Sequence, residues 1–213
     1  MIVKFTIEHK ESDLKDIPLS STVAILIGTF DPIHRGHIEV AQQALKQNLG
    51  DSGVDLVLFH LHSNSRKKMP SPYQDRLEIL KGYLFDQTQL GMLDPVINEL
   101  IENIVKGNLY SHPISWVSVL FQLLSSYHPI SYARILGSDR IAKAVEEQLN
   151  IRHYVSPRDM ADIALPANFI VLPKPKMHLS STSYRNGSQP FGSEYWRVTK
   201  ILRKIYPNAK FST

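Results

Sequence analysis

Residues 25–37 read ILIGTFDPIHRGH, and this stretch indicates the local order of secondary structure around it. The apolar run that stops at Gly28 predicts a buried β-strand over residues 22–28. The apolar residues over 38–49 recur at helical spacing and predict a helix. We therefore expect a strand, a short loop and a helix in this order.

Two histidines, His34 and His37, lie three residues apart just before this helix. Residues three apart share one face of a helix, and a helix N-terminus offers unpaired N–H groups to anions. In the loop before them, Gly28 permits close approach of the backbone to a ligand, Thr29 offers a hydroxyl and Pro32 stiffens the chain. These features favour a site that binds a chain of phosphates. Metal ligation, which requires a spacing of four or a third ligand, and simple packing are the alternatives.

The rest of the chain alternates between predicted strands and predicted helices. Further strands are expected over residues 54–59, 95–100, 133–137, 151–156 and 169–172, and further helices over 72–85, 115–125 and 138–149. Residues 1–8 are expected to add an edge strand, 101–114 and 157–168 to be irregular, and 180–213 to be a helical part. This alternation implies right-handed crossovers and a parallel sheet covered on both faces. The predicted fold class is α/β: a Rossmann-like doubly wound parallel sheet with helices on both faces, forming a single domain over residues 1–213.

Composition restricts the class of protein. The 213 residues are 43% hydrophobic and 21% charged, contain no cysteine and carry a formal net charge of +4. The absence of cysteine excludes disulfides and thiolate metal sites. The start of the chain lacks a signal-peptide pattern, and no apolar stretch approaches the ~20 residues of a membrane span. We expect a cytoplasmic protein with a small polyanionic ligand and no nucleic acid or membrane partner, and a homo-oligomer stays open.

The sequence GTFDPIHRGH at residues 28–37 resembles the first signature of the HxGH nucleotidyltransferase superfamily, and specifically of its nicotinamide/nicotinate mononucleotide adenylyltransferase family. The second signature of that family, SSTxxR, is matched by SSTSYR at residues 180–185. Weaker correspondences lie between them, at residues 67–68 with 76–77, 115–116, 136–139 and 155–158.

The resemblance implies that the protein transfers the adenylyl group of ATP to nicotinamide or nicotinate mononucleotide, giving NAD or its deamido form plus pyrophosphate. The preference between the two mononucleotides stays open. Because the attacking phosphate is already anionic, catalysis would rest on alignment and on charge stabilisation. Mg²⁺ is expected to enter with ATP, with no metal ligand from protein side chains. His60 and His62 share a face of a predicted strand as metal ligands can, but no carboxylate cluster accompanies them.

The resemblance also assigns roles to individual residues. The implied catalytic residues are His34, His37 and Arg185. The implied ATP-binding residues are Gly28, Thr29, Phe30, Gly137, Asp139, Ser181 and Thr182. The implied mononucleotide-binding residues are Lys67, Lys68, Trp116 and Arg158. Several have structural alternatives, since Ser181, Thr182 and Asp139 suit helix N-caps and Trp116 suits a core position.

The departures from the family lie on the mononucleotide side. HSNSRKKMPSP at residues 62–72 replaces the bacterial P-P-H-K loop, and SWVSVLF at 115–121 replaces S-Y-T-I-D-T-L. The alternatives are another HxGH nucleotidyltransferase with a different phosphate acceptor, such as phosphopantetheine or glycerol phosphate, and a non-catalytic nucleotide-binding relative. A class I aminoacyl-tRNA synthetase core shares a HIGH-like signature, but this chain shows no KMSKS-like loop.

Overall fold

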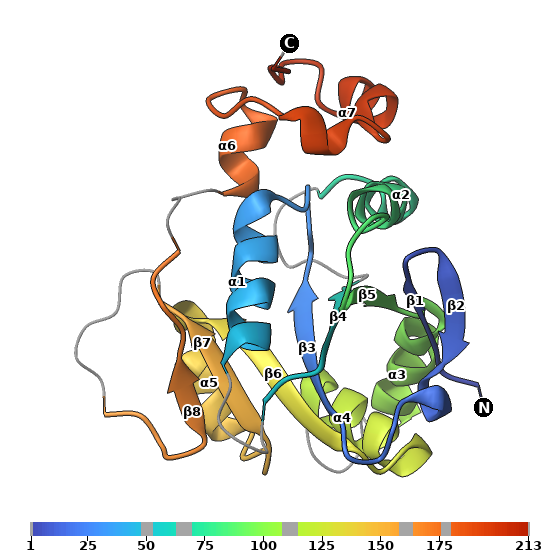
Figure 1. Ribbon diagram of the computed structural model, residues 1–213, viewed down its shortest axis with the longest axis vertical. Helices are drawn as coiled ribbons and strands as arrows, with labels where there is room; N and C mark the ends of the chain where they lie inside the picture. The colour runs from blue at the N-terminus through green and yellow to red at the C-terminus, as the bar shows by residue number, and fades with distance from the viewer. Residues whose placement is uncertain are drawn as a thin grey trace.

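The computed structural model describes residues 2–47, 53–62, 70–107, 115–157, 164–175 and 180–212, and within these ranges the strands form an eight-stranded sheet (Figure 1). The strands are β1 (Lys4–Ile7), β2 (Lys10–Asp13), β3 (Thr22–Gly28), β4 (Leu56–Leu61), β5 (Leu90–Leu93), β6 (Ser131–Gly137), β7 (Arg152–Ser156) and β8 (Phe169–Val171). The α-helices are α1 (Arg35–Lys46), α2 (Tyr73–Tyr83), α3 (Val96–Gly107), α4 (Trp116–Tyr127), α5 (Ile141–Glu146), α6 (Ser181–Arg185) and α7 (Thr199–Ile205). Short 3₁₀ helices are η1 (Leu14–Asp16), η2 (Ser138–Arg140) and η3 (Ser193–Tyr195).

The order of the strands identifies the fold. The sheet runs β2-β1-β5-β4-β3-β6-β7-β8, with parallel pairing from β5 to β8 and antiparallel pairing of β1 with β2 and β5. The six parallel strands follow the Rossmann order, in which the chain winds outward in both directions from β3 and β6. The protein therefore has a Rossmann-like α/β fold with its switch point between β3 and β6, where such sheets bind ligands outside the carboxyl ends of the strands.

Strand β3 shows why this sheet must be covered on both faces. Ala24 and Leu26 pack in a core cluster with α1, α2 and the carboxyl-terminal helices, whereas Val23 and Ile25 pack in a second cluster with α3 and α4. Successive residues of a strand point to opposite faces, so the continuous apolar run of β3 supplies both cores. The carboxyl-terminal helices α6 and α7 lie beyond the carboxyl end of β3 (Figure 1).

Most elements predicted from the sequence are confirmed. The strand over residues 22–28 is β3 without a shift, and β4, β6, β7 and β8 fall within two residues of their predicted bounds. Helices α2 and α4 also match closely, and α1 begins three residues before the predicted start. None of the described helices is long and apolar enough to cross a membrane.

Three predictions of secondary structure are wrong. The segment 95–100 is the start of helix α3, in which Ile97 and Ile101 are buried one turn apart, and the neighbouring strand is β5. Residues 101–107 are consequently helical, while 108–114 and 158–163 lie outside the described residues. The amino-terminal strand β1 is not the edge, because β2 pairs outside it. The predicted helix over residues 138–149 is present over 138–146, where the 3₁₀ helix η2 continues into α5.

A buried polar group, His153, lies in the middle of β7. Its ring stacks on Phe169 with centroids 4.5 Å apart, and neither ring nitrogen has a hydrogen-bond partner among the described residues. Arg134 and Glu147 form a buried ion pair of 2.5 Å between Nη1 and Oε2 nearby. Burial, and secondly the charge of Arg134, lower the pKa of His153 to about 4. The imidazole is therefore neutral in the folded protein at pH 7.

The depressed pKa of His153 predicts a loss of stability in mild acid. Between about pH 6.5 and pH 4 the unfolded chain binds a proton that the folded chain does not, so the free energy of unfolding falls as the pH falls through this range. Between pH 7 and pH 5 the free energy of unfolding, measured in urea, should fall for both proteins. The fall should be about 1–2 kcal/mol smaller for His153→Gln than for the wild type. Buried His60, with a pKa lowered to about 3, leaves a remaining dependence in the same direction. Parallel pH profiles of the two proteins would contradict the assignment.

Candidate active site

The loop between β3 and α1, residues 29–34, lies at the switch point of the sheet. A Cβ on Gly28, where the loop begins, would lie 2.6 Å from a ring carbon of Phe30, so a larger residue here would force this ring to move. Phe30 has a φ of +42°, a left-handed conformation that is strained for a bulky residue and is often found at functional sites. Its ring packs edge-on against His37, with centroids 5.1 Å apart. The start of the loop is thus held in one unusual conformation.

The two histidines interact directly at the start of α1. His34 is the buried N-cap residue, and its backbone N–H donates to Nδ1 of His37 over 3.2 Å. His37 occupies the third helical position, where a capping box has Glu or Gln. The two rings stack with centroids 3.8 Å apart. Because Nδ1 accepts a hydrogen bond, neutral His37 carries its proton on Nε2 and can donate it to an anion.

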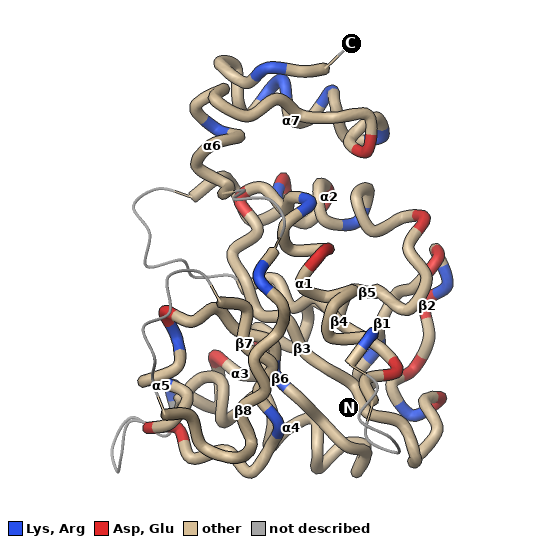
Figure 2. The backbone as a smooth tube through the Cα atoms, turned by 60° about the vertical axis from the view of Figure 1, so that its left-hand side comes forward, with Lys and Arg blue, Asp and Glu red and all other residues tan. Residues whose placement is uncertain are grey.

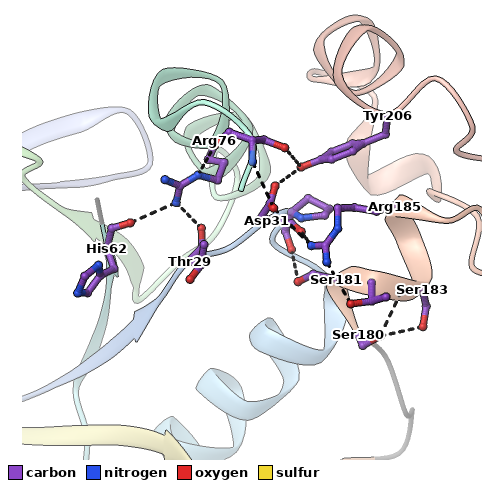
Figure 3. A network of polar contacts seen from close by, with 12 residues as sticks. Thr29, Asp31, His62, Arg76, Ser180, Ser181, Ser183, Arg185 and Tyr206 are labelled. Carbon is purple, nitrogen blue, oxygen red and sulfur yellow. Dashed lines mark hydrogen bonds and ion pairs between the residues drawn. The ribbon is translucent and has the colours of Figure 1, made fainter. Parts of the chain in front are cut away.

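A buried arginine fixes the loop from the opposite side. Arg76 on α2 is 1% exposed, and its Nη1 donates to the carbonyl oxygens of Thr29 at 2.7 Å and His62 at 3.2 Å (Figure 3). Its Nε donates to the carbonyl oxygen of Ser71 at 2.9 Å. Burial lowers the pKa of Arg76, and the charge of Asp31 opposes this shift. One guanidinium therefore joins the loop after β3, the end of β4 and the approach to α2.

The second sequence motif docks on the same loop through helix α6. Ser180 is the N-cap of α6 and accepts a hydrogen bond from the backbone N–H of Ser183 at 3.1 Å. The alternative that Ser181 or Thr182 caps this helix is therefore wrong. Ser181 Oγ instead donates to the carbonyl oxygen of Pro32 at 2.9 Å. The hydroxyl of Ser181 thereby joins the two motifs through a contact between residues that lie 149 positions apart in the sequence.

Arg185 extends this contact to Asp31. Its Nη1 donates to the backbone oxygen of Asp31 and lies 3.4 Å from Asp31 Oδ2, and its Nη2 donates to Thr182 Oγ1 at 3.1 Å (Figure 3). The carboxylate of Asp31 is 9% exposed and also accepts from the hydroxyl of Tyr206 at 2.5 Å. The Arg185 side chain remains 32% exposed. The two histidines and Arg185 therefore border one loop from two different helices.

Gly137 is the last residue of β6, the parallel neighbour of β3, and Asp139 follows this strand, so both lie at the same edge of the sheet. The Asp139 side chain is 60% exposed, and its Oδ2 lies 3.6 Å from Nε of Arg140. Gly137, not Asp139, is the N-cap of η2, so the alternative that Asp139 is a helix cap is wrong. Lys67, Lys68 and Arg158, which the sequence places on the mononucleotide side, lie outside the described residues.

Trp116 begins α4 and lies against the end of β4. Its ring centroid is 5.0 Å from that of His60 and 4.7 Å from that of His62, and the residue packs partly against the core. His60 Nε2 is 3.0 Å from Oδ1 of Asn98, and burial lowers the pKa of His60 to about 3. Burial and the charge of Arg76 lower the pKa of His62. Within the described ranges, no group of three or more His, Cys, Asp or Glu is placed to hold a metal ion.

The carboxyl-terminal part contributes positive charge to this end of the molecule (Figure 2). Residues 180–212 contain six basic residues and a single acidic residue, Glu194. The basic residues are Arg185, Arg197, Lys200, Arg203, Lys204 and Lys210. A positive field next to the switch point favours the approach of an anionic ligand.

Three site residues have no role in the sequence analysis: Asp31, Arg76 and Tyr206. Asp31 stands inside the first motif, and Arg76 belongs to one of the weaker correspondences, so a signal existed for both. Their partners lie far away in the chain and could not be paired from the sequence. Tyr206 lies beyond both motifs and has no sequence signal of its own.

Comparisons with known proteins agree with this geometry. Residues 25–187, more than half of the chain, match the family model described as cytidylyltransferase-like. The chain is 28% identical over 190 residues to a protein of Synechococcus sp. (strain JA-2-3B'a(2-13)) named "Probable nicotinate-nucleotide adenylyltransferase", with 80% of this chain and 87% of that protein covered. A Dehalococcoides mccartyi (strain BAV1) protein of the same name is 28% identical over 180 residues, covering 78% and 85% of the two chains.

Solved structures with the same fold include a Plasmodium falciparum nicotinic acid mononucleotide adenylyltransferase. Its complex with NaAD superposes with a TM-score of 0.55 at 16% identity, covering 78% of this chain and 83% of that chain. Its complex with APC gives a TM-score of 0.53 at the same identity and coverage. At 16% identity this similarity is evidence for the fold alone.

The Arg76 contacts predict that a lysine cannot replace this residue. Arg76→Lys keeps the charge but loses the planar fork, so it leaves at least one buried carbonyl group unsatisfied. We expect the free energy of unfolding to fall by about 2–4 kcal/mol in urea titrations. Arg203→Lys on the exposed face of α7 is the matched control and should change it by less than about 0.5 kcal/mol. Equal effects of the two substitutions would show that the three carbonyl contacts contribute nothing specific.

Proposed function

The chain belongs to the cytidylyltransferase-like family and is a nucleotidyltransferase, and from this premise we propose that it transfers the adenylyl group of ATP to a pyridine mononucleotide. The observation that carries the proposal is the meeting of His34 and His37 with Arg185 around one loop at the switch point. The names of the relatives support nicotinate mononucleotide as the acceptor, with nicotinamide mononucleotide as the second candidate.

In this proposal the loop after β3 and the start of α1 hold the triphosphate. The first-turn N–H groups of α1 and the Nε2–H of His37 would donate to phosphate oxygens, and the Thr29 hydroxyl would add another contact. Ser181 and Thr182 would support the triphosphate from α6. The ribose of ATP would lie beside Gly137 and Asp139 at the end of the adjacent strand, where the Asp139 carboxylate would accept hydrogen bonds from the ribose hydroxyls.

The transfer itself requires little proton chemistry. A phosphate oxygen of the mononucleotide would attack the α-phosphorus of ATP, and the bond from this phosphorus to the oxygen bridging it to the β-phosphorus would break. Pyrophosphate would leave with the electron pair of that bond. Arg185 would stabilise the charge that develops on the leaving group, because its fork matches two phosphate oxygens. Mg²⁺ would accompany ATP through the phosphate oxygens, which are the hard ligands it prefers.

The acceptor would lie toward the end of β4. Trp116 offers an aromatic face for the pyridine ring, and the neighbouring imidazole of His60 is uncharged at neutral pH because burial lowers its pKa. Lys67, Lys68 and Arg158 are proposed to contact the acceptor from the sequence resemblance alone. An aromatic surface of this kind suits either pyridine, so the choice between acid and amide needs direct measurement.

A substrate panel tests the proposed function. ATP is combined with nicotinate mononucleotide, nicotinamide mononucleotide, phosphopantetheine or glycerol phosphate, and pyrophosphate release is measured. We expect release with a pyridine mononucleotide, and a fall of about 10²–10³ in kcat for His37→Ala, the scale for removing one transition-state donor. His9→Asn, in the turn between β1 and β2, is the control and should keep the wild-type kcat. The proposal would be refuted if pyrophosphate were released only with a different acceptor, or if no acceptor of the panel gave release.

A second measurement tests the acceptor side. Trp116→Ala should raise the KM for the pyridine mononucleotide about 10-fold while leaving the KM for ATP nearly unchanged, because stacking acts on one substrate. Trp196→Ala removes a tryptophan that is 65% exposed and should change neither KM. A large drop in melting temperature together with a rise of both KM values would show that Trp116 is a core residue.

A further inference from the structure

Tyr206 brings a side chain into the site from beyond the family-matched residues 25–187. It directly follows α7 and is 5% exposed. Its hydroxyl donates to Asp31 Oδ1 at 2.5 Å and accepts from Ser71 Oγ at 3.0 Å (Figure 3). Burial and the hydrogen bond to Asp31 raise the pKa of Tyr206, so the phenol keeps its proton and remains a donor.

The position of Tyr206 is fixed by packing against the rest of the carboxyl-terminal part. Its ring stacks on Phe191, and its backbone N–H bonds to the carbonyl oxygen of Leu202 at 2.8 Å. Gly187, which follows α6, has a φ of +72° and lets Asn208 approach so closely that a Cβ would lie 2.4 Å from its carbonyl oxygen. Tyr206 is therefore held in a defined place relative to α6, the helix that carries Arg185.

The two carboxylate oxygens of Asp31 have different partners. Oδ1 accepts the short hydrogen bond from Tyr206, whereas Oδ2 lies 3.4 Å from both Arg185 Nη1 and the backbone N–H of Ser71. Arginine and a carboxylate with two available oxygens frequently form a bidentate pair, which is stronger than a single long contact. In the structure the Tyr206 hydroxyl binds Oδ1, whereas Arg185 approaches Oδ2.

We propose that Tyr206 is a positioning residue that prevents Asp31 from forming a bidentate ion pair with Arg185, so that the guanidinium can bind phosphate oxygens. The inference rests on the proposed function, because it takes Arg185 as a group that binds pyrophosphate. When the phenol is removed, the carboxylate of Asp31 competes with pyrophosphate for the same guanidinium. Tyr206 then acts on the leaving group through two other residues and touches no substrate.

The test is the Kd of magnesium pyrophosphate, measured by calorimetry on the full chain. Tyr206→Phe keeps the ring and its packing, and we expect it to weaken pyrophosphate binding about 10-fold. Tyr132→Phe is the matched control, since it removes another buried phenol, bonded to the carbonyl oxygens of Leu124 and His128 on α4 and just after it. Tyr132→Phe should leave the Kd unchanged. An unchanged Kd in Tyr206→Phe would overturn the inference.

Double variants separate this mechanism from a general loosening of the loop. In an Asp31→Asn background, which cannot form the ion pair, Tyr206→Phe should change the Kd by less than about twofold. If Asp31→Asn does not fold, Arg185→Ala serves as the background, and Tyr206→Phe should again have no further effect. A full 10-fold loss in either background would overturn the inference, because the effect would then not run through the Asp31–Arg185 pair.

The same measurements distinguish this inference from the proposed function. Wild-type protein that binds pyrophosphate, but transfers adenylyl to no pyridine mononucleotide, would refute the acceptor and leave the role of Tyr206 standing. Wild-type protein that binds neither ATP nor pyrophosphate would refute the phosphate role of Arg185 and the inference with it.

Discussion

A buried cation holds together the segments from which the site is built. Removing the Arg76 guanidinium from water costs free energy, and its three carbonyl partners offset that cost. These carbonyl groups belong to the loop after β3, the end of β4 and the approach to α2. The position of Thr29, and of the histidines that follow it, therefore depends on how α2 docks on the sheet. Tertiary packing, more than local preference, sets the geometry of the loop after β3.

The fold could be predicted where one segment carried its own signal. Strand β3 is an uninterrupted apolar run that ends at Gly28, so its bounds and its burial on both faces followed from the sequence. The segment 95–100 was misassigned, because a short apolar run does not distinguish a strand from the first turn of a helix. Strand β5 has four residues, one of them Gly91, and gave too little pattern to detect.

The arrangement of the site could likewise be predicted only where it depends on residues that are close together in the sequence. His34 and His37 lie within one stretch, so the spacing predicts that they share a face at the start of a helix, and the structure adds that their rings stack. The N-cap of α6 lies one residue before Ser181, because Ser180 has the extended backbone of a cap. The partners of Asp31 could not be found, because the contacts from Arg185 and Tyr206 span 154 and 175 residues.

The long span of the Tyr206 contact has a consequence for the protein during its synthesis. During translation the amino terminus emerges from the ribosome first, so β3 and the elements that follow it emerge before α7 and Tyr206. Both sequence motifs are complete once residue 185 has emerged, yet Asp31 still lacks the phenol that engages Oδ1. A nascent chain that stops short of residue 206 would carry both motifs without the hydrogen bond from Tyr206 to Asp31. Under the role proposed for Tyr206, the loop after β3 is completed only once residue 206 has emerged, later than the strands of the sheet.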